Sequence, residues 1–403
     1  MLNIDFTNQL DKIKPNHTYF ALPGKRFDNS LMLARSAIEK GARQIVAFKY
    51  VCENLQPHFS NVKFIPSIHP RYDYALRCQQ FFYPKKKHIL IGVTGSKGKT
   101  SVAFMLHNTL PDSVYIGTLG VYTNGVKIAL PKPCQSDLTT PQPEQLYAIF
   151  GYISAQLPNV KHIIFEYTSI GLDASRCIEK LDLGVFTNFV PDDHLIYHHT
   201  AENYLACKQL LIAQSDRMIY PNTYPEKQSF MIFNRELVEK VCNVLGYCNP
   251  VNTFVPSRME KITPAQTQTN QCDIFLDFAH TPYSLEAALM HLADYPARIV
   301  VFGCGGDRDA EKRHKMGQVA QKLATKIIVT DDNPRTEDPS LIRSAIIAGC
   351  MGATEIPDRK QAIRYAIEYG TTLSQCAVLI LDKGHDEQDA DRTTIEECCA
   401  NLR

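Results

Sequence analysis

The chain has 403 residues, of which 44% are hydrophobic, and this length allows two or three domains with sizeable cores. Its 43 basic and 42 acidic residues nearly cancel, which argues against nucleic acid or a membrane surface as a general partner. No apolar run is long enough to span a membrane and no signal peptide is visible, so we expect a cytoplasmic protein. The 13 cysteines include no C-x-x-C pair, and free thiols explain them better than a disulfide framework.

Residues 1–86 predict a small α/β domain. Short strands are expected over 19–22 and 44–48, with an amphipathic helix over 31–40 between them. No cluster of catalytic residue types occurs in this stretch. The proline and lysines of 81–87 (FFYPKKK) mark the first linker, and these lysines form either a solvated face or the rim of an anion site.

The stretch GVTGSKGKTS at 92–101 is the most informative in the chain. It follows an apolar run at 89–93 that predicts a buried strand, and it opens a predicted helix over 102–110. Glycines at such a turn let backbone N–H groups approach phosphate oxygens, and the helix N-terminus adds partial positive charge. Lys99 can then reach the β- and γ-phosphates of a nucleotide, while the Thr100 hydroxyl can bind Mg²⁺.

The spacing of this loop departs by one residue from the common G-x-x-x-x-G-K-[ST] pattern, because Gly92 lies too far from Gly98. A plain glycine turn between strand and helix is the alternative interpretation. A Gly-Lys-Thr-Ser sequence that opens a helix after a buried strand favours a phosphate-binding loop. The predicted nucleotide-binding residues of this loop are Gly95, Ser96, Lys97, Gly98, Lys99, Thr100 and Ser101.

Residues 87–255 are predicted to form the nucleotide domain, with polar groups where strands end. An apolar strand at 160–165 runs into Glu166, whose carboxylate is placed to reach Mg²⁺, and a helix-cap or surface glutamate is the alternative interpretation. A strand at 183–186 runs into a loop that contains His194, which is read equally as a metal ligand or a structural histidine. From the residues alone, Lys208 in the next predicted helix is an ordinary surface lysine.

Residues 256–403 predict a third α/β domain, a doubly wound sheet with a polar loop after each strand. Strands expected near 274–278, 298–303, 326–330 and 377–381 each run into such a loop. Glycines followed by mixed charges suit an anionic ligand, and a charged surface loop is the alternative. The polar residues of these loops are His280, Arg308, Lys312, Asp332, Asn333, Arg335, Gly384 and Asp386.

Six segments taken in order resemble the Mur ligases, in particular the branch that adds the third residue of the peptidoglycan stem peptide. Five of them follow the phosphate loop. They read VFTNFVPDDHLIYHHTAENYLACKQLL (185–211), SRMEKI (257–262), DFAHTPYSLEAAL (277–289), VFGCGGDRDAEKR (301–313) and TDDNPRTEDP (330–339). KGHDE (383–387) is a weaker match. The resemblance covers most of the chain from about residue 88.

The resemblance implies a three-domain α/β enzyme, with a central P-loop ATPase domain and a C-terminal Rossmann-like domain. Its domains would be a divergent N-terminal UDP-substrate domain (1–86), a shortened ATP-binding domain (87–255) and an amino-acid-binding domain (256–403). It would use ATP and Mg²⁺ to join meso-diaminopimelate to UDP-N-acetylmuramoyl-L-alanyl-D-glutamate through an acyl phosphate, in peptidoglycan biosynthesis. We expect these small molecules to be its only partners and the chain to act as a monomer.

The resemblance also implies residue roles. Thr100, Glu166, His194 and Lys208 would bind metal, with Lys208 carbamylated, and Lys99, Glu166, His194 and Lys208 would be the catalytic set. His280, Arg308 and Lys312 would reach ATP from the third domain. Arg335 would pair with the distal carboxylate of diaminopimelate, because an arginine fork suits a carboxylate. The substrate-binding set would be Thr139, Thr140, Ser169, Arg176, Asp332, Asn333, Arg335, Gly384 and Asp386.

Several departures from the family pattern leave the carboxylate substrate open. The family's D-S-R near the start reads Gln9-Leu10-Asp11, and only 49 residues separate Lys208 from Arg258. Two alternatives are therefore retained. One is a divergent paralogue that joins an amino acid to a different carboxylate, and the other is a non-catalytic nucleotide-binding protein. The folate-polyglutamate branch is disfavoured by the sequence at 332–335.

Overall fold

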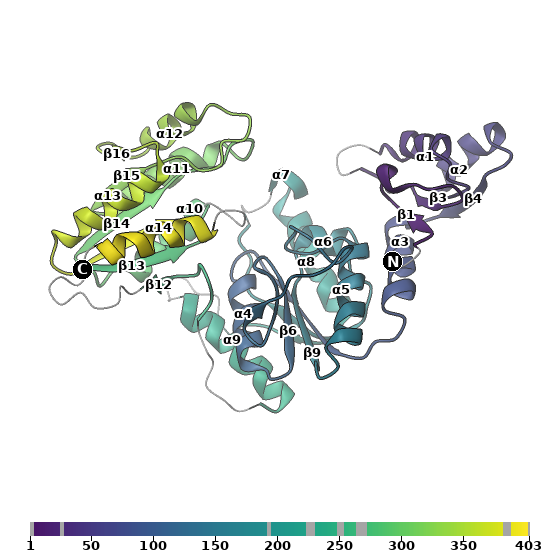
Figure 1. Cartoon of the computed structure of the whole chain (residues 1–403), viewed down its shortest axis with the longest axis horizontal. Coiled ribbons are helices and arrows are strands. Elements are labelled where there is room, and N and C mark those ends of the chain that lie inside the picture. Colours follow the sequence, from purple (N-terminus) through teal and green to yellow (C-terminus); the bar gives the residue numbers. More distant parts are fainter. Residues whose placement is uncertain are drawn as a thin grey trace. The chain divides into compact units, whose positions relative to one another are not determined.

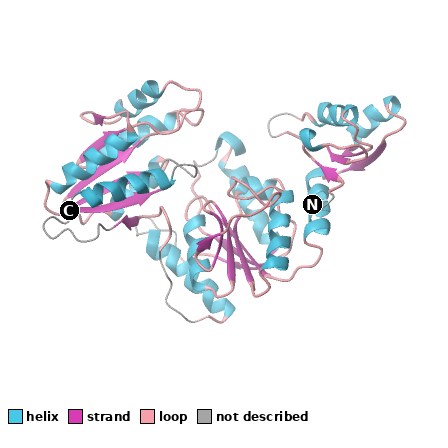
Figure 2. Cartoon of the chain, in the orientation of Figure 1, coloured by secondary structure: helices cyan, strands magenta, loops and turns pink. Residues whose placement is uncertain are grey.

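The computed structural model contains three separate β-sheets, each with helices packed against it (Figures 1 and 2). The chain divides into two compact units, one of 1–95, 110–186 and 200–219, the other of 96–109, 187–199 and 220–403. Within the described residues, no helix is both long and apolar enough to cross a membrane. The structure describes residues 4–24, 28–191, 195–222, 230–247, 254–262, 272–381 and 388–401.

The N-terminal sheet belongs to the first unit and is parallel throughout, in the order β1-β2-β3-β4. Alternate residues of β3 point to opposite faces, as strand geometry requires. Ile45 and Ala47 pack with α1 and α2, whereas Val46 packs with Tyr74 of α3. The elements are β1 (Phe6–Thr7), β2 (Thr18–Phe20), β3 (Gln44–Phe48), β4 (Lys63–Ser67), α1 (Ser30–Glu39), α2 (Lys49–Leu55) and α3 (Pro70–Phe82).

The central sheet has seven strands in the order β11-β10-β5-β9-β6-β7-β8. Its first five members are parallel, and β7 and β8 close one edge as an antiparallel hairpin. The sheet comprises β5 (Ile89–Thr94), β6 (Ser113–Gly117), β7 (Gly120–Thr123), β8 (Val126–Lys127), β9 (His162–Glu166), β10 (Leu181–Phe186) and β11 (Ser215–Ile219). The carboxyl ends of β5, β9 and β10 therefore lie side by side at the topological switch point, where ligands bind in open α/β sheets.

The C-terminal sheet belongs to the second unit and has the order β12-β13-β17-β14-β15-β16. It is parallel except for β12. The strands are β12 (Glu260–Ile262), β13 (Cys272–Asp277), β14 (Ala297–Phe302), β15 (Lys326–Val329), β16 (Thr354–Glu355) and β17 (Cys376–Leu381). Helices cover both faces of this sheet (Figure 2). They are α10 (Pro282–His291), α11 (Glu311–Leu323), α12 (Pro339–Ile347), α13 (Arg359–Thr371) and α14 (Gln388–Asn401).

The two faces of the C-terminal sheet explain its continuous apolar strands. Val300 and Phe302 of β14 pack with α10, α11 and α12, whereas Ile299 and Val301 pack with α13 and α14. A strand covered on both faces needs apolar residues at every position. The sequence predicted these strands as buried runs, and the structure confirms them within one or two residues of the expected ends.

Four helices that do not cover the C-terminal sheet carry or contact residues of the candidate site. In the second unit α4 (Lys99–Thr109) follows the phosphate loop and contacts α9 (Phe230–Leu245). In the first unit α8 (Ala201–Gln214) packs on α6 (Ser169–Asp173). The described cysteines are all free thiols.

Candidate active site

The loop after β5 has the backbone that a phosphate cradle needs. Gly95 and Gly98 have φ angles of 146° and 80°, which residues with a side chain rarely adopt. The α4 helix begins directly after Gly98, so its first backbone N–H groups lie in this turn. The Lys99 ammonium donates to the carbonyl of Ser96 at 3.1 Å.

The loop after β10 supports the phosphate loop through neutral groups. The backbone N–H groups of Ser96 and Lys97 donate to the carbonyl and the side-chain Oδ1 of Asn188, both at 2.9 Å. The Thr187 hydroxyl donates to the Lys97 carbonyl at 2.5 Å, and the Val190 N–H donates to the Ser96 hydroxyl at 2.9 Å. The Thr-Asn pair thus fixes the path of residues 96–97.

Two buried amide groups beside this loop have unused hydrogen-bonding atoms. The Nδ2 of Asn188 and the Oδ1 of Asn234, on α9, have no hydrogen-bond partner among the described residues. Asn234 lies against Gly98, since a Cβ at that position would meet its Oδ1 at 2.8 Å. Buried polar atoms without partners are costly in a folded protein, and a nucleotide offers both acceptors and donors. These atoms and the glycine backbone therefore fit a nucleotide.

Glu166 ends β9, the strand next to β5, and is paired in register with Val93. Its side chain is only 1% exposed. The carboxylate accepts hydrogen bonds from the Tyr115 hydroxyl at 2.5 Å and from the Thr118 N–H at 2.8 Å. A Cβ at Gly117 would overlap the same carboxylate, at 2.3 Å from Oε1, so glycine leaves room for it. The interpretation of Glu166 as a surface glutamate is wrong.

The predicted threonines lie beside Glu166 in the first unit. The Thr140 hydroxyl donates to the Glu166 carbonyl at 2.8 Å, and Thr139 shares a 3.0 Å hydrogen bond with the hydroxyl of Thr118. Arg176 is buried and donates to the Thr140 carbonyl at 2.5 Å. Ser169 is buried in the first turn of α6. The structure thus brings Thr139, Thr140, Arg176 and Glu166 together.

Lys208 is a buried residue of α8. It is 1% exposed, and its Nζ lies 4.4 Å from the centre of the Tyr204 ring. Its interpretation from the residues alone, a surface lysine, is therefore wrong. Nothing in the sequence indicated this burial, because apolar residues are spread around the helix and mark no single buried face. Of the remaining predicted metal ligands, Thr100 is buried in the first turn of α4, and His194 lies outside the described residues.

In the second unit, the loop after β13 and the first turn of α11 bring His280 and Lys312 together. The Lys312 ammonium donates to the carbonyl of His280 at 2.9 Å. Asp277, the last residue of β13, accepts from the N–H groups of Met259 and Ala279 at 2.8 Å each. Burial raises the pKa of the Asp277 carboxyl. Arg308 is exposed on the loop after β14.

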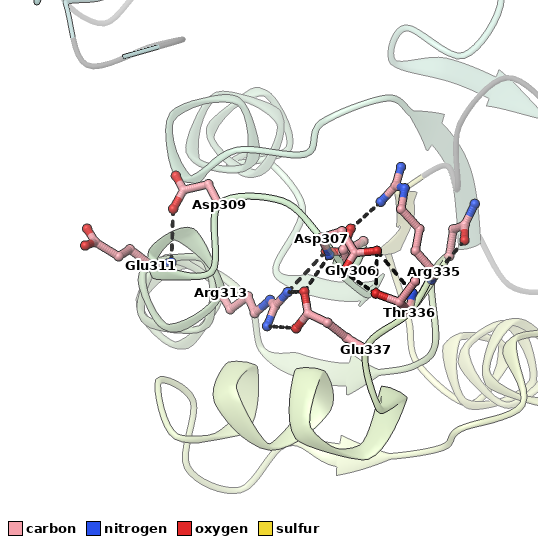
Figure 3. A network of polar contacts seen from close by, with 10 residues as sticks. Gly306, Asp307, Asp309, Glu311, Arg313, Arg335, Thr336 and Glu337 are labelled. Atoms are coloured by element: carbon pink, nitrogen blue, oxygen red, sulfur yellow. Dashed lines mark hydrogen bonds and ion pairs between the residues drawn. The ribbon is translucent and has the colours of Figure 1, made fainter. Parts of the chain in front are cut away.

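Arg335 projects from a turn that follows β15 (Figure 3). Its φ angle of 51° is unusual for a residue with a side chain. Its guanidinium donates to the Gly306 carbonyl at 2.5 Å, and the Gly306 N–H donates to the Asn333 carbonyl at 2.9 Å. The Asn333 side chain accepts from the Arg335 N–H at 3.3 Å, and Asp332 is half-buried. The other two predicted residues, Gly384 and Asp386, lie outside the described residues.

The turn at Arg335 packs directly against the glycines of the loop after β14. A Cβ at Gly306 would lie 1.9 Å from the Pro334 carbonyl oxygen, and one at Gly305 would lie 2.8 Å from the Arg335 guanidinium. Gly306 is therefore required by the close approach of the two loops, because it meets backbone, whereas a side chain at 305 would meet only the end of the flexible Arg335 side chain. The sequence pattern marked these glycines as part of an anion site, and the structure shows what they make room for.

Sequence reasoning missed three residues of this region. Asn234 lies more than 130 residues from the loop that it contacts, and nothing in its helix marked it. Arg313 and Glu337 form a two-bonded ion pair at 2.8 Å that joins α11 to the turn after Arg335 (Figure 3). The guanidinium lowers the pKa of the Glu337 carboxyl. The sequence had offered only their presence in charged blocks.

Each of the two units carries candidate binding groups at the carboxyl ends of parallel strands. The first unit supplies a buried carboxylate and hydroxyls at the end of a strand adjacent to β5. The loop of residues 96–101 supplies backbone donors and a lysine. The C-terminal loops supply an arginine fork, which binds carboxylates in two-bonded fashion.

Comparisons with known proteins identify the family of this chain. The "Mur ligase middle domain" model matches residues 93–248, and the "Mur ligase, glutamate ligase domain" model matches 257–385. The UDP-N-acetylmuramoyl-L-alanyl-D-glutamate–2,6-diaminopimelate ligase of Rickettsia bellii (strain RML369-C) is 30% identical over 450 aligned positions. That alignment covers 94% of this chain and 90% of the relative. The enzyme of the same name from Rickettsia conorii (strain ATCC VR-613 / Malish 7) is 32% identical and covers 93% and 89%.

Solved structures share the fold. A structure of a UDP-N-acetylmuramoyl-L-alanyl-D-glutamate–2,6-diaminopimelate ligase matches with a TM-score of 0.58 and 21% identity, covering 99% of this chain and 95% of that one. MurF ligase from Thermotoga maritima, solved in complex with ADP, matches with a TM-score of 0.58 and 14% identity over the full length of both chains. On the strength of the family models and of relatives at 30% identity or more over nearly the whole chain, this protein belongs to the Mur ligase family.

Proposed function

We propose that this Mur ligase joins meso-diaminopimelate to UDP-N-acetylmuramoyl-L-alanyl-D-glutamate, with ATP converted to ADP and phosphate, in peptidoglycan biosynthesis. The observation that carries the proposal is the Arg335 turn. It presents an arginine fork at the carboxyl edge of the C-terminal sheet, in a chain that shares about 90% of the length of relatives with that activity in their names.

The reaction begins with the carboxylate of the nucleotide sugar. A carboxylate is a poor acyl donor, because its oxygen is a poor leaving group. Transfer of the γ-phosphoryl group from ATP gives an acyl phosphate and ADP. In this proposal the backbone N–H groups of residues 98–100 and the Lys99 ammonium bind the phosphates and stabilise charge that develops during transfer.

Magnesium is assigned to Thr100 and Glu166, with His194 and Lys208 as the further ligands that the family implies. A hydroxyl and a carboxylate are oxygen donors of the kind that Mg²⁺ prefers, and a buried carboxylate at a strand end is already oriented by Tyr115 and Thr118. When bound, Mg²⁺ offsets the negative charge that gathers on the phosphates. The unused amide atoms of Asn188 and Asn234 are assigned to the nucleotide.

The second step uses the amino acid. The amine of diaminopimelate attacks the acyl carbon, the amide bond forms and phosphate leaves. Arg335 would pair with the carboxylate at the far end of the molecule, with Asp332 and Asn333 beside it. His280, Arg308 and Lys312 are assigned to the nucleotide, and Gly384 and Asp386 to the substrate. Thr139, Thr140, Ser169 and Arg176 are assigned to the side of the carboxylate substrate. The domain limits 1–86, 87–255 and 256–403 are part of the same proposal.

We also propose that Lys208 is carbamylated. Only an unprotonated amine reacts with CO₂, and burial disfavours the charged form of an amine. Lys208 is almost fully buried. The reaction forms an N–C bond, releases one proton and leaves a carbamate anion whose oxygens can bind Mg²⁺. Protein equilibrated with ¹³C-bicarbonate should give a carbamate carbon signal that the Lys208→Ala variant lacks.

A second candidate, a paralogue that uses a different carboxylate, is favoured by one observation. Where the family carries D-S-R, this chain has Gln9, Leu10 and Asp11. Gln9 directly precedes a short 3₁₀ turn (Leu10–Lys12), and its N–H donates to the Thr7 hydroxyl at 3.0 Å. This turn has no arginine to bind the nucleotide sugar. Calorimetry with UDP-muramoyl dipeptide separates the two, because tight binding would remove the paralogue.

Phosphate release from ATP tests the proposal as a whole. Purified protein is given UDP-muramoyl-L-alanyl-D-glutamate, Mg²⁺ and a panel of amino acids. We expect release only when the nucleotide sugar and diaminopimelate are both present. We expect the Lys99→Ala variant to lose about 10²–10³-fold in kcat, as when a charge-stabilising group is removed from an active site. Release with diaminopimelate but another carboxylate would establish the paralogue, and ATP binding without release would establish a non-catalytic protein.

A further inference from the structure

Two loops of the C-terminal sheet are joined by a network of hydrogen bonds that reaches well beyond Arg335 itself. One loop covers residues 303–309 after β14, and the other covers 330–337 after β15. Figure 3 shows Asp307 of the first loop between Thr336 of the second and the Arg313–Glu337 pair. The two loops therefore form one rigid surface at the carboxyl edge of the sheet.

Glu337 is the centre of this network. Its two carboxylate oxygens accept from the two terminal nitrogens of Arg313, each at 2.8 Å. The same carboxylate accepts from the backbone N–H of Asp307 at 2.5 Å. The Arg313 side chain is only 6% exposed, and its Nε has no hydrogen-bond partner among the described residues. A guanidinium buried to this degree depends on its counter-charge, so Glu337 cannot be lost without moving Arg313.

The opposite side of the turn is fastened by Asp307. Its carboxylate accepts from the Thr336 hydroxyl at 2.7 and 2.9 Å and from the Thr336 N–H at 3.1 Å. Asp307 itself has a φ angle of 52°. Arg335 precedes these fastened residues directly and has the same kind of backbone, with φ at 51°. Such a conformation persists in residues with side chains only where the surroundings impose it.

The direction of the Arg335 fork depends on that imposed backbone. One of its nitrogens already donates to the Gly306 carbonyl, which lies next to Asp307 in the chain. If Glu337 released the Asp307 N–H, both the arginine backbone and the carbonyl that orients its side chain would be free to move. A two-bonded arginine–carboxylate pair is sensitive to such movement, because both hydrogen bonds need correct geometry at once.

We infer that Glu337 is a positioning residue that fixes Arg335 through Arg313 and Asp307, and so sets the preference for an amino acid with a second carboxylate. This inference rests on the proposed function, in which Arg335 receives that carboxylate. The substrate class it specifies is a diamino acid with an acidic far end, as opposed to lysine, whose far end carries only an ammonium.

The first test compares selectivity in the full-length enzyme. The ratio of kcat/KM for meso-diaminopimelate to kcat/KM for L-lysine is measured for wild type, Glu337→Gln, Glu337→Asp and Glu397→Gln. Because this ratio is internal to each preparation, partial unfolding does not change it. We expect Glu337→Gln to lower the ratio about tenfold, with KM for ATP unchanged, since one charged hydrogen bond is misaligned. Glu337→Asp keeps the charge, so its ratio should lie between that of Glu337→Gln and that of wild type.

Glu397→Gln is the matched control, because Glu397 pairs with Arg364 on the surface of the same sheet's helices, with both side chains about half exposed. It should keep the wild-type ratio. Arg335→Ala sets the scale of the effect. If Arg335→Ala collapses the ratio while Glu337→Gln leaves it unchanged, the inference is overturned. If Arg335→Ala also leaves the ratio unchanged, the proposed amino-acid site is wrong.

A second readout does not depend on any substrate. Hydrogen exchange of peptides that cover 303–309 and 330–337 is compared between wild type and Glu337→Gln, with β17 as the internal reference. We expect the two loop peptides to exchange at least about tenfold faster while β17 stays protected, because local opening needs little energy once the contacts are lost. Equal exchange in the loops would overturn the inference even if the enzyme proves to use another amino acid.

Discussion

The loop after β5 and the loops after β14 and β15 each follow the carboxyl ends of parallel strands, in the central and in the C-terminal sheet. The contacts that hold these loops in place differ. Neutral groups of Thr187, Asn188 and Val190 support the phosphate loop. Ion pairs of buried arginines support the C-terminal loops. The pairs at these loops are Arg313 with Glu337 and Arg343 with Asp331 and Glu355. A third pair of the same domain, Arg359 with Asp391, joins α13 to α14.

The difference follows from the ligands that each edge is proposed to receive. A triphosphate carries several negative charges, so a carboxylate used as a fastener beside it would repel it, and a guanidinium would compete for it. An amino acid carries charges of both signs, so the protein loops that bind it tolerate ion pairs. In this proposal Arg335 remains available to bind the amino acid. The four predictions below run from the largest expected effect to the smallest.

Removing the counter-charge of a buried arginine should have the largest effect on stability. Arg359 and Asp391 have side chains 8% and 6% exposed, and Arg359 also donates to the carbonyl of Leu381, the last residue of β17. Asp391→Asn leaves the guanidinium without its counter-charge, which should lower the free energy of unfolding by about 3–5 kcal/mol. Chemical denaturation measures this. A loss under 1 kcal/mol would mean that the pair is not the fastener we describe.

A buried histidine in the helix after the phosphate loop should make the stability of the protein depend on pH. His107 of α4 is buried, and burial lowers its pKa to about 4. The unfolded chain therefore takes up a proton first. Stability is full above pH 6.5 and falls as pH drops towards 4, by up to roughly 3 kcal/mol. Unfolding of wild type and His107→Gln should be followed from pH 7 to 4.5. We expect the variant to lose less stability, and parallel curves would contradict the assignment.

Removing a neutral hydrogen bond should lower the free energy of unfolding less than removing a buried counter-charge. Thr187 is fully buried, and its hydroxyl donates to the carbonyl of Lys97. Thr187→Val keeps the shape and removes this bond, which should lower the free energy of unfolding by about 1–2 kcal/mol. KM for ATP should rise, whereas selectivity between amino acids should not change. A larger loss than that of Asp391→Asn would reverse the comparison.

Removing an ion pair that is exposed to solvent should have the smallest effect on stability. Arg364 and Glu397 form an exposed pair at 3.2 Å. Glu397→Gln should change the free energy of unfolding by no more than about 0.5 kcal/mol, because solvent screens such pairs. Denaturation in low and high salt checks this. A cost comparable to that of Asp391→Asn would show that burial is not what separates the two pairs.

Much of the fold could be predicted from the sequence, because buried parallel strands read as apolar runs and their polar loops follow at once. This reasoning placed Glu166 and Arg335 where strands end, as the structure confirms, and their roles stay predictions. The burial of Lys208 could not be predicted, since its helix shows no clear apolar face. The contact of Asn234 with Gly98, and the pairing of Arg313 with Glu337, join residues from separate elements, and local patterns carry no information about such contacts.

The contact between Gly306 and Pro334 limits how selectivity could be changed by engineering. Because no side chain fits at 306, neither loop can be reshaped while the other stays fixed. A library that varies residues 332–337 alone would sample mostly surfaces that the neighbouring loop rejects. Residues 303–313 and 330–337 would have to be exchanged together, so that Arg313 and Glu337 are transplanted as a matched pair.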